Sequence, residues 1–164
     1  MRVDSLDIEI SIVPNKPENK ALVTAALRLL ARRDYPRAEF IKKLDAAEFD
    51  KEEIAAAADW CHAQGFLNET RFAESISRRL GAKYGTQRVA HTLRQKGVAE
   101  DHVNAAISTL KESEPDRASA LWTRKFGRVA ESADEKSKQI RYLQSRGFSF
   151  AIIKQVIAGT FEAH

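Results

Sequence analysis

The sequence has one cysteine, four prolines and seven glycines in 164 residues, and it contains no long hydrophobic run. Because Cys61 has no second cysteine to pair with, an internal disulfide is excluded and a reducing compartment is favoured. No apolar segment approaches the ~20 residues that span a membrane, and the first residues lack the apolar core of a signal peptide. We therefore expect a cytoplasmic protein that is not inserted in a membrane.

Sequence patterns of catalytic sites are also missing. There is no glycine-rich phosphate loop and no nucleophile elbow, and the four histidines lie far apart. Cys61 and His62 are adjacent, which places them on different faces of a helix rather than at a metal-ligand spacing. A Cys–His catalytic pair stays open as an alternative without support. We expect no catalytic residues, no metal and no cofactor, and hence no enzyme.

An apolar pattern recurs at spacings of 49 and then 50 residues. Leu44, Leu93 and Leu143 occupy one equivalent position in three successive segments. Matching apolar positions without matching polar ones indicate a repeated architectural unit whose solvent faces differ. The other equivalent sets are Phe49, Val98 and Phe148; Ile54, Val103 and Ile153; Val23, Phe72 and Trp122; and Leu27, Ile76 and Phe126.

Each repeat is predicted to contain three helices, so the fold is expected to be all-α. Units of about 50 residues are marginal alone, so three tandem helix-turn-helix-like repeats should pack into an elongated, curved body. The expected repeats cover residues 20–68, 69–114 and 115–164. Helical periodicity and turn residues place the helices at residues 21–33, 36–44, 51–64, 69–80, 86–96, 99–110, 115–127, 133–146 and 149–158.

Local signals predict how several of these helices begin and end. Pro36 suits the first turn of the second helix, and Asp50 with Glu53 forms the pattern of a capping box. Gly65 should end the third helix. Gly97 and Gly147 share one repeat position, where a left-handed turn would reverse the chain. The first repeat has Glu48 there, so its turn is expected to be built differently.

Residues 1–19 form a separate N-terminal arm in this interpretation. Leu6, Ile8, Ile10 and Ile12 alternate with polar residues, a period-two pattern that predicts a short strand. A single strand has no partner in an all-α chain, so the arm is either ordered by itself or ordered on binding.

Positive charge accumulates toward the C-terminus. The net charge is −1 over residues 1–20, −2 over 21–69, +3 over 70–118 and +4 over 119–164. Between Ser75 and Ala99 six Lys or Arg occur without a carboxylate, which favours a polyanion or an acidic protein as partner. The alternative is a solvated face balanced by acids elsewhere in space. The expected partner- or DNA-binding residues are Arg78, Arg79, Lys83, Arg88, Arg94, Lys96, Lys125, Arg128, Arg141 and Arg146.

Two further patterns resemble nucleic-acid-binding features only in part. Arg88, Arg94 and Lys96 surround a tight turn, as in a DNA-reading helix-turn-helix, but the following helix begins with the acidic residues 100–101. Sequence-specific reading is therefore not expected, whereas contact with the phosphate backbone stays open. Trp60, Trp122, Phe126 and Phe150 resemble a base-stacking platform, but the repeat alignment assigns Trp122 and Phe126 to the core.

Four segments resemble the RecX family. Residues 65–73 (GFLNETRFA) resemble its junction into the second repeat, and residues 84–89 (YGTQRV) with 93–98 (LRQKGV) its second-repeat helix and turn. Residues 142–150 (YLQSRGFSF) are similar to its third-repeat ending, and residues 35–39 (YPRAE) fit the first repeat less sharply. The resemblance covers residues 20–158, with four fragments in the expected order.

The resemblance implies a regulator of the RecA recombinase that binds in the groove of the RecA–DNA filament. It implies inhibition of filament extension, ATPase, strand exchange and co-protease activity, with no catalytic residue or cofactor to carry over. Two alternatives stay open: a module that binds DNA without RecA, with weak direct DNA binding as a lesser form, and a helical scaffold that binds peptides. Because no apolar face is left over after the core is assigned, we expect a monomer.

Overall fold

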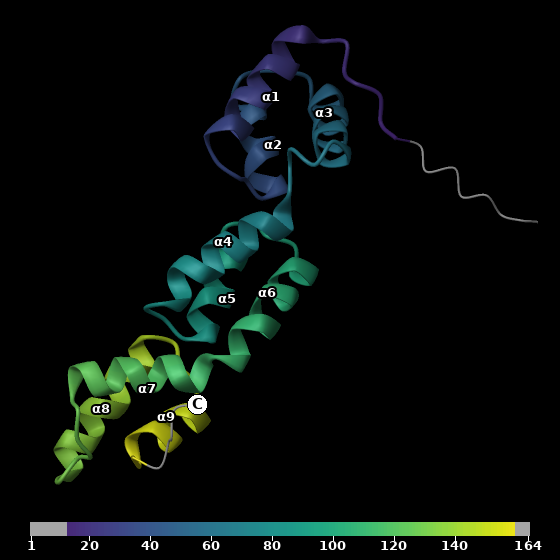
Figure 1. Ribbon diagram of the computed structural model, residues 1–164. Helices are drawn as coiled ribbons and strands as arrows, with labels where there is room; N and C mark the ends of the chain where they lie inside the picture. Colours follow the sequence, from purple (N-terminus) through teal and green to yellow (C-terminus); the bar gives the residue numbers. More distant parts are fainter. Residues whose placement is uncertain (1–12, 160–164) are drawn as a thin grey trace, which may run out of the picture.

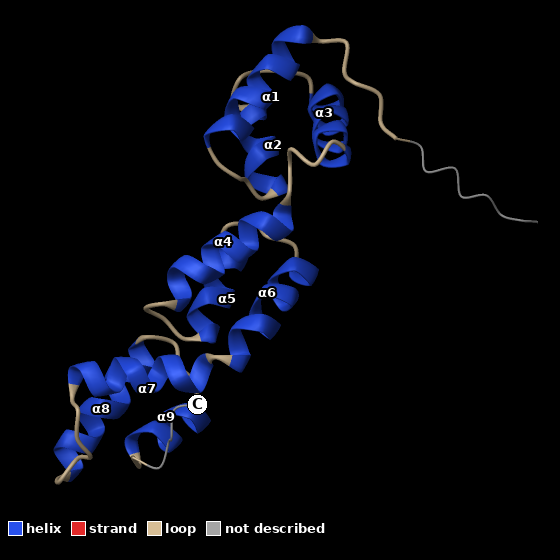
Figure 2. Cartoon of the chain, in the orientation of Figure 1, coloured by secondary structure: helices blue, strands red, loops and turns tan. Residues whose placement is uncertain are grey.

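The structure, a computed structural model, describes residues 13–159 and contains nine α-helices and no strand in that range. The chain forms three bundles in a row along an elongated, bent body (Figure 1), and every regular element is helical (Figure 2). This confirms the predicted all-α class with tandem three-helix repeats. The helices are α1 Lys20–Arg32, α2 Arg37–Asp45, α3 Lys51–Ala63, α4 Glu69–Gly81, α5 Thr86–Gln95, α6 Glu100–Glu112, α7 Glu114–Lys125, α8 Ala133–Ser145 and α9 Phe150–Ile157.

The strand predicted over Leu6 to Ile12 lies outside the described residues. Residues 13–19, the described part of the expected arm, form no helix before Lys20. None of the helices between residues 13 and 159 is long and apolar enough to cross a membrane.

Each repeat encloses its own hydrophobic core. The equivalent leucines Leu44, Leu93 and Leu143 are almost completely buried, at 0–1% exposure, in three separate clusters. Ile54 and Ile153, one turn into the third helix of repeats 1 and 3, are buried in the same way. Burying one such side chain contributes about 1.5–3 kcal/mol. Each core therefore stabilises one repeat, and the contacts between repeats have to come from other residues.

Most helix ends follow the predicted signals, with two corrections. Asp50 caps α3 by accepting hydrogen bonds from the N–H groups of Glu52 and Glu53, at 2.9 and 3.2 Å. The predicted capping box is wrong, because the Glu53 carboxylate accepts from the Asn19 side chain at 3.0 Å. Pro36 is the N-cap of α2 rather than a residue of its first turn. The sequence pattern located both helix starts, but it misplaced Pro36 by one position and did not identify Asn19 as the partner of Glu53.

The turn after α2 agrees only in part with the expectation that Glu48 requires a different construction. Glu48 has φ +60°, the same left-handed region as Gly97 at +77° and Gly147 at +85°. Its N–H donates to the Asp45 carbonyl at 3.0 Å, as Gly97 does to Arg94 at 2.9 Å. Repeat 1 therefore uses the same left-handed position, with a residue for which this backbone is strained. The other two turns add a second bond, from Val98 N–H to the Leu93 carbonyl at 3.2 Å and from Phe148 N–H to the Leu143 carbonyl at 3.3 Å, that Phe49 does not form among the described residues.

The junctions between repeats depend on helix caps supplied by the following repeat. Neither α2 nor α5 has a side-chain N-cap of its own, since Pro36 and Gly85 occupy those positions. Glu69, in the first turn of α4, accepts a hydrogen bond from the Arg37 N–H at 3.3 Å. Glu114, in the first turn of α7, accepts from the Thr86 N–H at 2.8 Å. Each carboxylate satisfies a free N–H at the positive end of a helix dipole.

An arginine two or three residues after each capping glutamate contacts the loop that precedes the capped helix. Arg71 in α4 pairs with Asp34 in the α1–α2 loop, with Nη2 2.6 Å from Oδ1. Arg117 in α7 donates to the carbonyls of Gly81 and Tyr84 at 2.7 and 2.8 Å. The two junctions thus use the same pair of residue types from the first helix of the next repeat.

The second and third repeats approach more closely than the first and second. The Gly85 N–H donates to the Arg146 carbonyl at 2.7 Å, and a Cβ added at Gly85 would lie 2.3 Å from the Gly147 oxygen. At the first junction, a Cβ added at Gly97 would meet only the Ala38 Cβ at 3.0 Å. We call the close contact, between residues 83–95 and residues 142–148, the α5–α8 seam.

The third repeat ends the series with a local cap. Ser132 accepts a hydrogen bond from the Glu135 N–H through its side chain, so α8 requires no glutamate from a following repeat. At the other end, the first turn of α1 carries no acidic residue that could cap a preceding repeat. The first and third repeats therefore differ from the second in how their helices are capped.

Replacing Glu48 by glycine is expected to stabilise the fold by about 0.5–1 kcal/mol, because glycine adopts the left-handed turn without strain. Chemical denaturation of Glu48→Gly and the wild type measures the difference. Gly147→Ala is the opposite control: its Cβ would lie 2.5 Å from the Arg88 Cβ, so it should destabilise. A less stable Glu48→Gly variant would contradict this account of the turn.

The two capping glutamates are expected to differ in their contribution to stability. Glu114 is buried and its hydrogen bond is short, so Glu114→Ala should lower the free energy of unfolding by about 2 kcal/mol. Glu69→Ala, at a longer bond, should lower it by under ~1 kcal/mol. Urea denaturation of both variants measures this order; equal losses would mean that the two junctions are equally tight.

Candidate partner-binding surface

Three of the ten basic residues predicted to meet a partner line three different hollows. Arg78 lines a groove between α4 and α6, Arg88 lines a groove at the α5–α8 seam, and Arg128 lines a small hollow beside Glu135. Arg78 and Arg88, which belong to the single positive stretch of the sequence, therefore lie in different grooves.

Two of these residues are paired with carboxylates. Arg94 binds Glu100 through two nitrogens, at 2.6 and 3.0 Å, and this hydrogen bonding lowers the pKa of Glu100. Arg128 binds Glu135 at 2.7 Å. The pKa of Glu135 is lowered by the backbone N–H of Glu131 and then by Arg128. Their charges are compensated locally, which is the alternative that the sequence left open.

Two other residues of the ten, Arg88 and Arg146, hold the α5–α8 seam together. Arg88 donates through Nη1 to the Ser145 carbonyl at 2.9 Å, and its guanidinium lies 4.3 Å from the centre of the Tyr84 ring. Arg146 donates to the Lys83 carbonyl at 3.4 Å and lies 5.7 Å from the same ring. Both arginines contact Tyr84, a residue that the sequence analysis did not select. The sequence signal was an aromatic residue directly before the N-cap Gly85.

The remaining basic residues keep their charge available. Within residues 13–159 none of them forms an ion pair with a carboxylate, and all are exposed. Arg141 donates only to the backbone carbonyl of Ser137, at 3.3 Å. The other members of this set are Arg78, Arg79, Lys83, Lys96 and Lys125.

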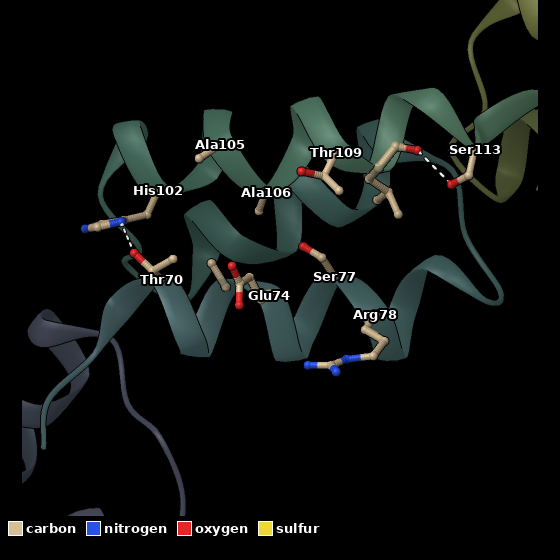
Figure 3. A pocket seen from close by; sticks show the side chains of 11 residues that line it. Thr70, Glu74, Ser77, Arg78, His102, Ala105, Ala106, Thr109 and Ser113 are labelled. Carbon is tan, nitrogen blue, oxygen red and sulfur yellow. Dashed lines mark hydrogen bonds between the residues drawn. The ribbon is translucent and has the colours of Figure 1, made fainter. Parts of the chain in front are cut away.

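A shallow groove of about 460 Å³ runs between α4 and α6, and small side chains form its walls (Figure 3). Ala73 and Ser77 come from α4, and Ala106 and Thr109 from α6. The Ser77 hydroxyl is buried and has no hydrogen-bond partner in the described part of the chain. The charged groups of its lining are Glu74 and Arg78 from α4, and its one imidazole, His102, comes from α6 (Figure 3).

That imidazole belongs to a hydroxyl–histidine–carboxylate series that the sequence analysis missed. His102 Nδ1 lies 3.1 Å from Thr70 Oγ1 (Figure 3), and His102 Nε2 lies 3.7 Å from Glu69 Oε2. The order resembles a catalytic triad, but 3.7 Å is too long for a hydrogen bond. Glu69 is also engaged in capping α2. We therefore assign the series to the first repeat junction rather than to catalysis.

Cys61 and His62 point to different environments, as the sequence predicted. Cys61 is completely buried in the first core, and burial raises the pKa of its thiol to about 11. His62 is exposed, with Nδ1 3.2 Å from the Leu67 carbonyl. No group of three His, Cys, Asp or Glu residues capable of holding a metal occurs between residues 13 and 159.

The aromatic residues are divided between core and surface. Trp122 is 8% exposed and donates through its indole N–H to Gln139 at 2.9 Å, which confirms its predicted place in the core. Phe126 packs edge-on against Tyr142, with ring centres 5.5 Å apart. Phe150 is exposed beside Lys154. Trp60, the fourth candidate, is partly buried and packs edge-on against Phe66, with ring centres 5.9 Å apart, so the four candidates have different surroundings.

Comparison with known proteins gives a consistent result along the chain. Models of the first, second and third three-helix domains of RecX match residues 24–61, 68–107 and 112–157. The regulatory protein RecX of Ralstonia pickettii is 36% identical over 92% of this chain and 93% of its own. That of Chromobacterium violaceum is 38% identical over 87% and 92%.

Solved structures agree on the fold. The crystal structure of RecX from Lactobacillus salivarius superposes with a TM-score of 0.76 at 19% identity, covering 85% of this chain and 94% of that one. A second crystal structure of a regulatory protein RecX has a TM-score of 0.70 at 20% identity, covering 83% and 71%.

Cys61 is expected to resist thiol reagents in the native protein at pH 8, because its thiol is buried and the reactive thiolate is disfavoured. Labelling with a chromogenic disulfide, with and without denaturant, measures this resistance. Rapid labelling of the native protein would contradict the expectation.

The raised pKa of Cys61 should also make stability depend on pH. Above the ordinary thiol pKa of 9.0, the unfolded chain loses this proton before the native chain does. Stability should therefore fall as the pH rises from about 9 to 11. Comparing the alkaline melts of the wild type and Cys61→Ala isolates this contribution.

Proposed function

Because the chain belongs to the RecX family, we propose that it regulates the RecA recombinase by binding in the groove of the RecA–DNA filament. In this proposal it inhibits filament extension, ATPase, strand exchange and co-protease activity, and so modulates recombinational repair and the SOS response in the cytoplasm. Its relatives at 33–38% identity are regulatory RecX proteins, a family not known for enzymatic activity.

The observation that carries the proposal is the linked, elongated arrangement of three modules. A helical filament offers the same subunit surface repeatedly, and a rod can contact several subunits at once. Because each further contact is intramolecular, total affinity exceeds that of any single module. The capping glutamates and the arginines that follow them restrain the orientation of neighbouring modules, which would keep such contacts in register.

Available positive charge supports an anionic or acidic target. Arg78 and Arg79 lie together on α4, and Lys83 follows in the next loop, without ion-pair partners among the described residues. Repeat 1 is mildly acidic by comparison. We propose that repeats 2 and 3 face DNA phosphates or acidic walls of the filament groove, and that repeat 1 faces basic protein surface. A single copy of the chain is sufficient for this arrangement.

The structure bears differently on the two alternative functions. A DNA-binding module independent of RecA would use the same cations, so its test is affinity for bare DNA. A peptide-binding scaffold would hold its peptide through apolar anchors rather than charges, so its test is the effect of salt on binding. Binding insensitive to salt would favour the scaffold, because screening weakens only charged contacts.

Reversing the three uncompensated charges Arg78, Arg79 and Lys83 to glutamate is expected to weaken filament binding at least about tenfold. Arg88 and Arg94 are less suitable targets, because one holds the α5–α8 seam and the other is paired with Glu100. The matched control reverses Arg28 and Arg32, which are exposed on α1.

The measurement is the single-stranded-DNA-dependent ATPase rate of RecA with this protein added well below one copy per RecA. The wild type should lower the rate, the α4 variant should need a higher concentration, and the α1 variant should act like the wild type. Equal losses in both variants would contradict the proposed polarity. No inhibition by the wild type, with tight binding to bare DNA, would replace the proposal by plain DNA binding.

A further inference from the structure

A polar groove of about 530 Å³ lies at the α5–α8 seam. It is lined from α5 by Gln87, Arg88, His91, Thr92 and Gln95, and from α8 and its turn by Gln144, Ser145 and Gly147. Every lining residue is polar or glycine, and none is a carboxylate. This composition differs from that of the α4–α6 groove, which has alanines in its walls.

The walls of this groove are held in fixed positions. The start of α5 and the end of α8 are joined by the hydrogen bond from the Gly85 N–H to the Arg146 carbonyl, at 2.7 Å. Arg88 crosses the same contact to reach the Ser145 carbonyl, at 2.9 Å. A site whose walls are ordered before binding loses less entropy when a ligand arrives.

Most hydrogen-bonding groups of the groove are unused. The side chains of Gln87, His91, Gln95 and Gln144 make no hydrogen bond to any other residue between 13 and 159, and all four are exposed. Arg88 uses one of its two terminal nitrogens. Each glutamine amide presents both a donor and an acceptor, so the groove can satisfy a ligand that has both.

This pairing of donors with acceptors distinguishes a polypeptide from a nucleic-acid backbone. Peptide groups carry one N–H donor and one C=O acceptor each, whereas phosphate oxygens only accept. A phosphate track would also require several free cations, and Arg88 is the only arginine or lysine in the lining. A carboxylate on the ligand could pair with Arg88. It could also pair with Arg141, which is exposed on α8 one helical turn from Gln144 and Ser145.

We propose that the groove at the α5–α8 seam binds an extended acidic polypeptide segment of the partner protein. This inference rests on the proposed function, in which the partner is RecA, and it assigns the contact to protein rather than to DNA. The glutamines would bond the peptide groups of the segment, and Arg88 and Arg141 would pair with its carboxylates.

The test introduces a charge at one exposed glutamine. Gln144→Glu should weaken binding to the RecA filament about tenfold, because it places a carboxylate against an acidic segment. Gln144→Lys should bind as tightly as the wild type or more tightly. Gln64→Glu, the same change at an exposed glutamine on repeat 1, is the matched control and should have no effect.

Binding is measured by fluorescence anisotropy of the labelled protein with assembled RecA filaments, and in parallel with bare single-stranded DNA. Thermal melts establish that the variants are folded. If the wild type binds the filament and Gln144→Glu binds equally well, the groove inference fails while the proposed function stands. If Gln144→Glu weakens binding to bare DNA to the same extent, the groove holds nucleic acid and the inference is overturned. If the wild type does not bind the filament, the proposed function fails and the inference fails with it.

Discussion

The architecture depends on two helix N-termini that have no caps of their own. Proline and glycine at the N-cap positions of α2 and α5 cannot accept a hydrogen bond through a side chain, and backbone N–H groups left unpaired are costly. Glu69 and Glu114 supply the acceptors from the following repeat. Because each cap comes from the next repeat, the stability of α2 and of α5 depends on the repeat that follows it. The series can end where a helix caps itself, as α8 does with Ser132.

The same junctions divide the positive charge of the protein into two groups. Arg71, Arg88, Arg117 and Arg146 hold loops and carbonyls between repeats, whereas Arg78, Arg79 and Lys83 project from α4 and its loop without compensation. Of the first group only Arg71 is paired with a carboxylate, whereas the others bond neutral carbonyls and keep their charge while their side chains are held in place. The two groups therefore differ in how freely their side chains can move to meet a partner.

The repeat pattern predicted the helices well because apolar periodicity is a local property that packing then uses directly. Leu44, Leu93 and Leu143 are buried in three separate cores, as their alignment predicted. Glu48 shows the limit of such arguments. Its residue type disfavours a left-handed turn, yet the packing of α2 and α3 on a shared core imposes the same reversal as in the other repeats, and the local strain is small beside that core.

The sequence by itself determined the number of repeats, the helices in each, their cores and the family to which the chain belongs, because these follow from short-range spacing and residue type. Only the tertiary structure decided which cations are structural and which are free, since the partners of Arg88, Arg117 and Arg146 lie 33 to 63 residues away. It also decided that Glu53 bonds Asn19 and that two glutamates cap helices of the preceding repeat. A polar side chain bonds whatever group folding brings within about 3 Å, and no local pattern specifies that group.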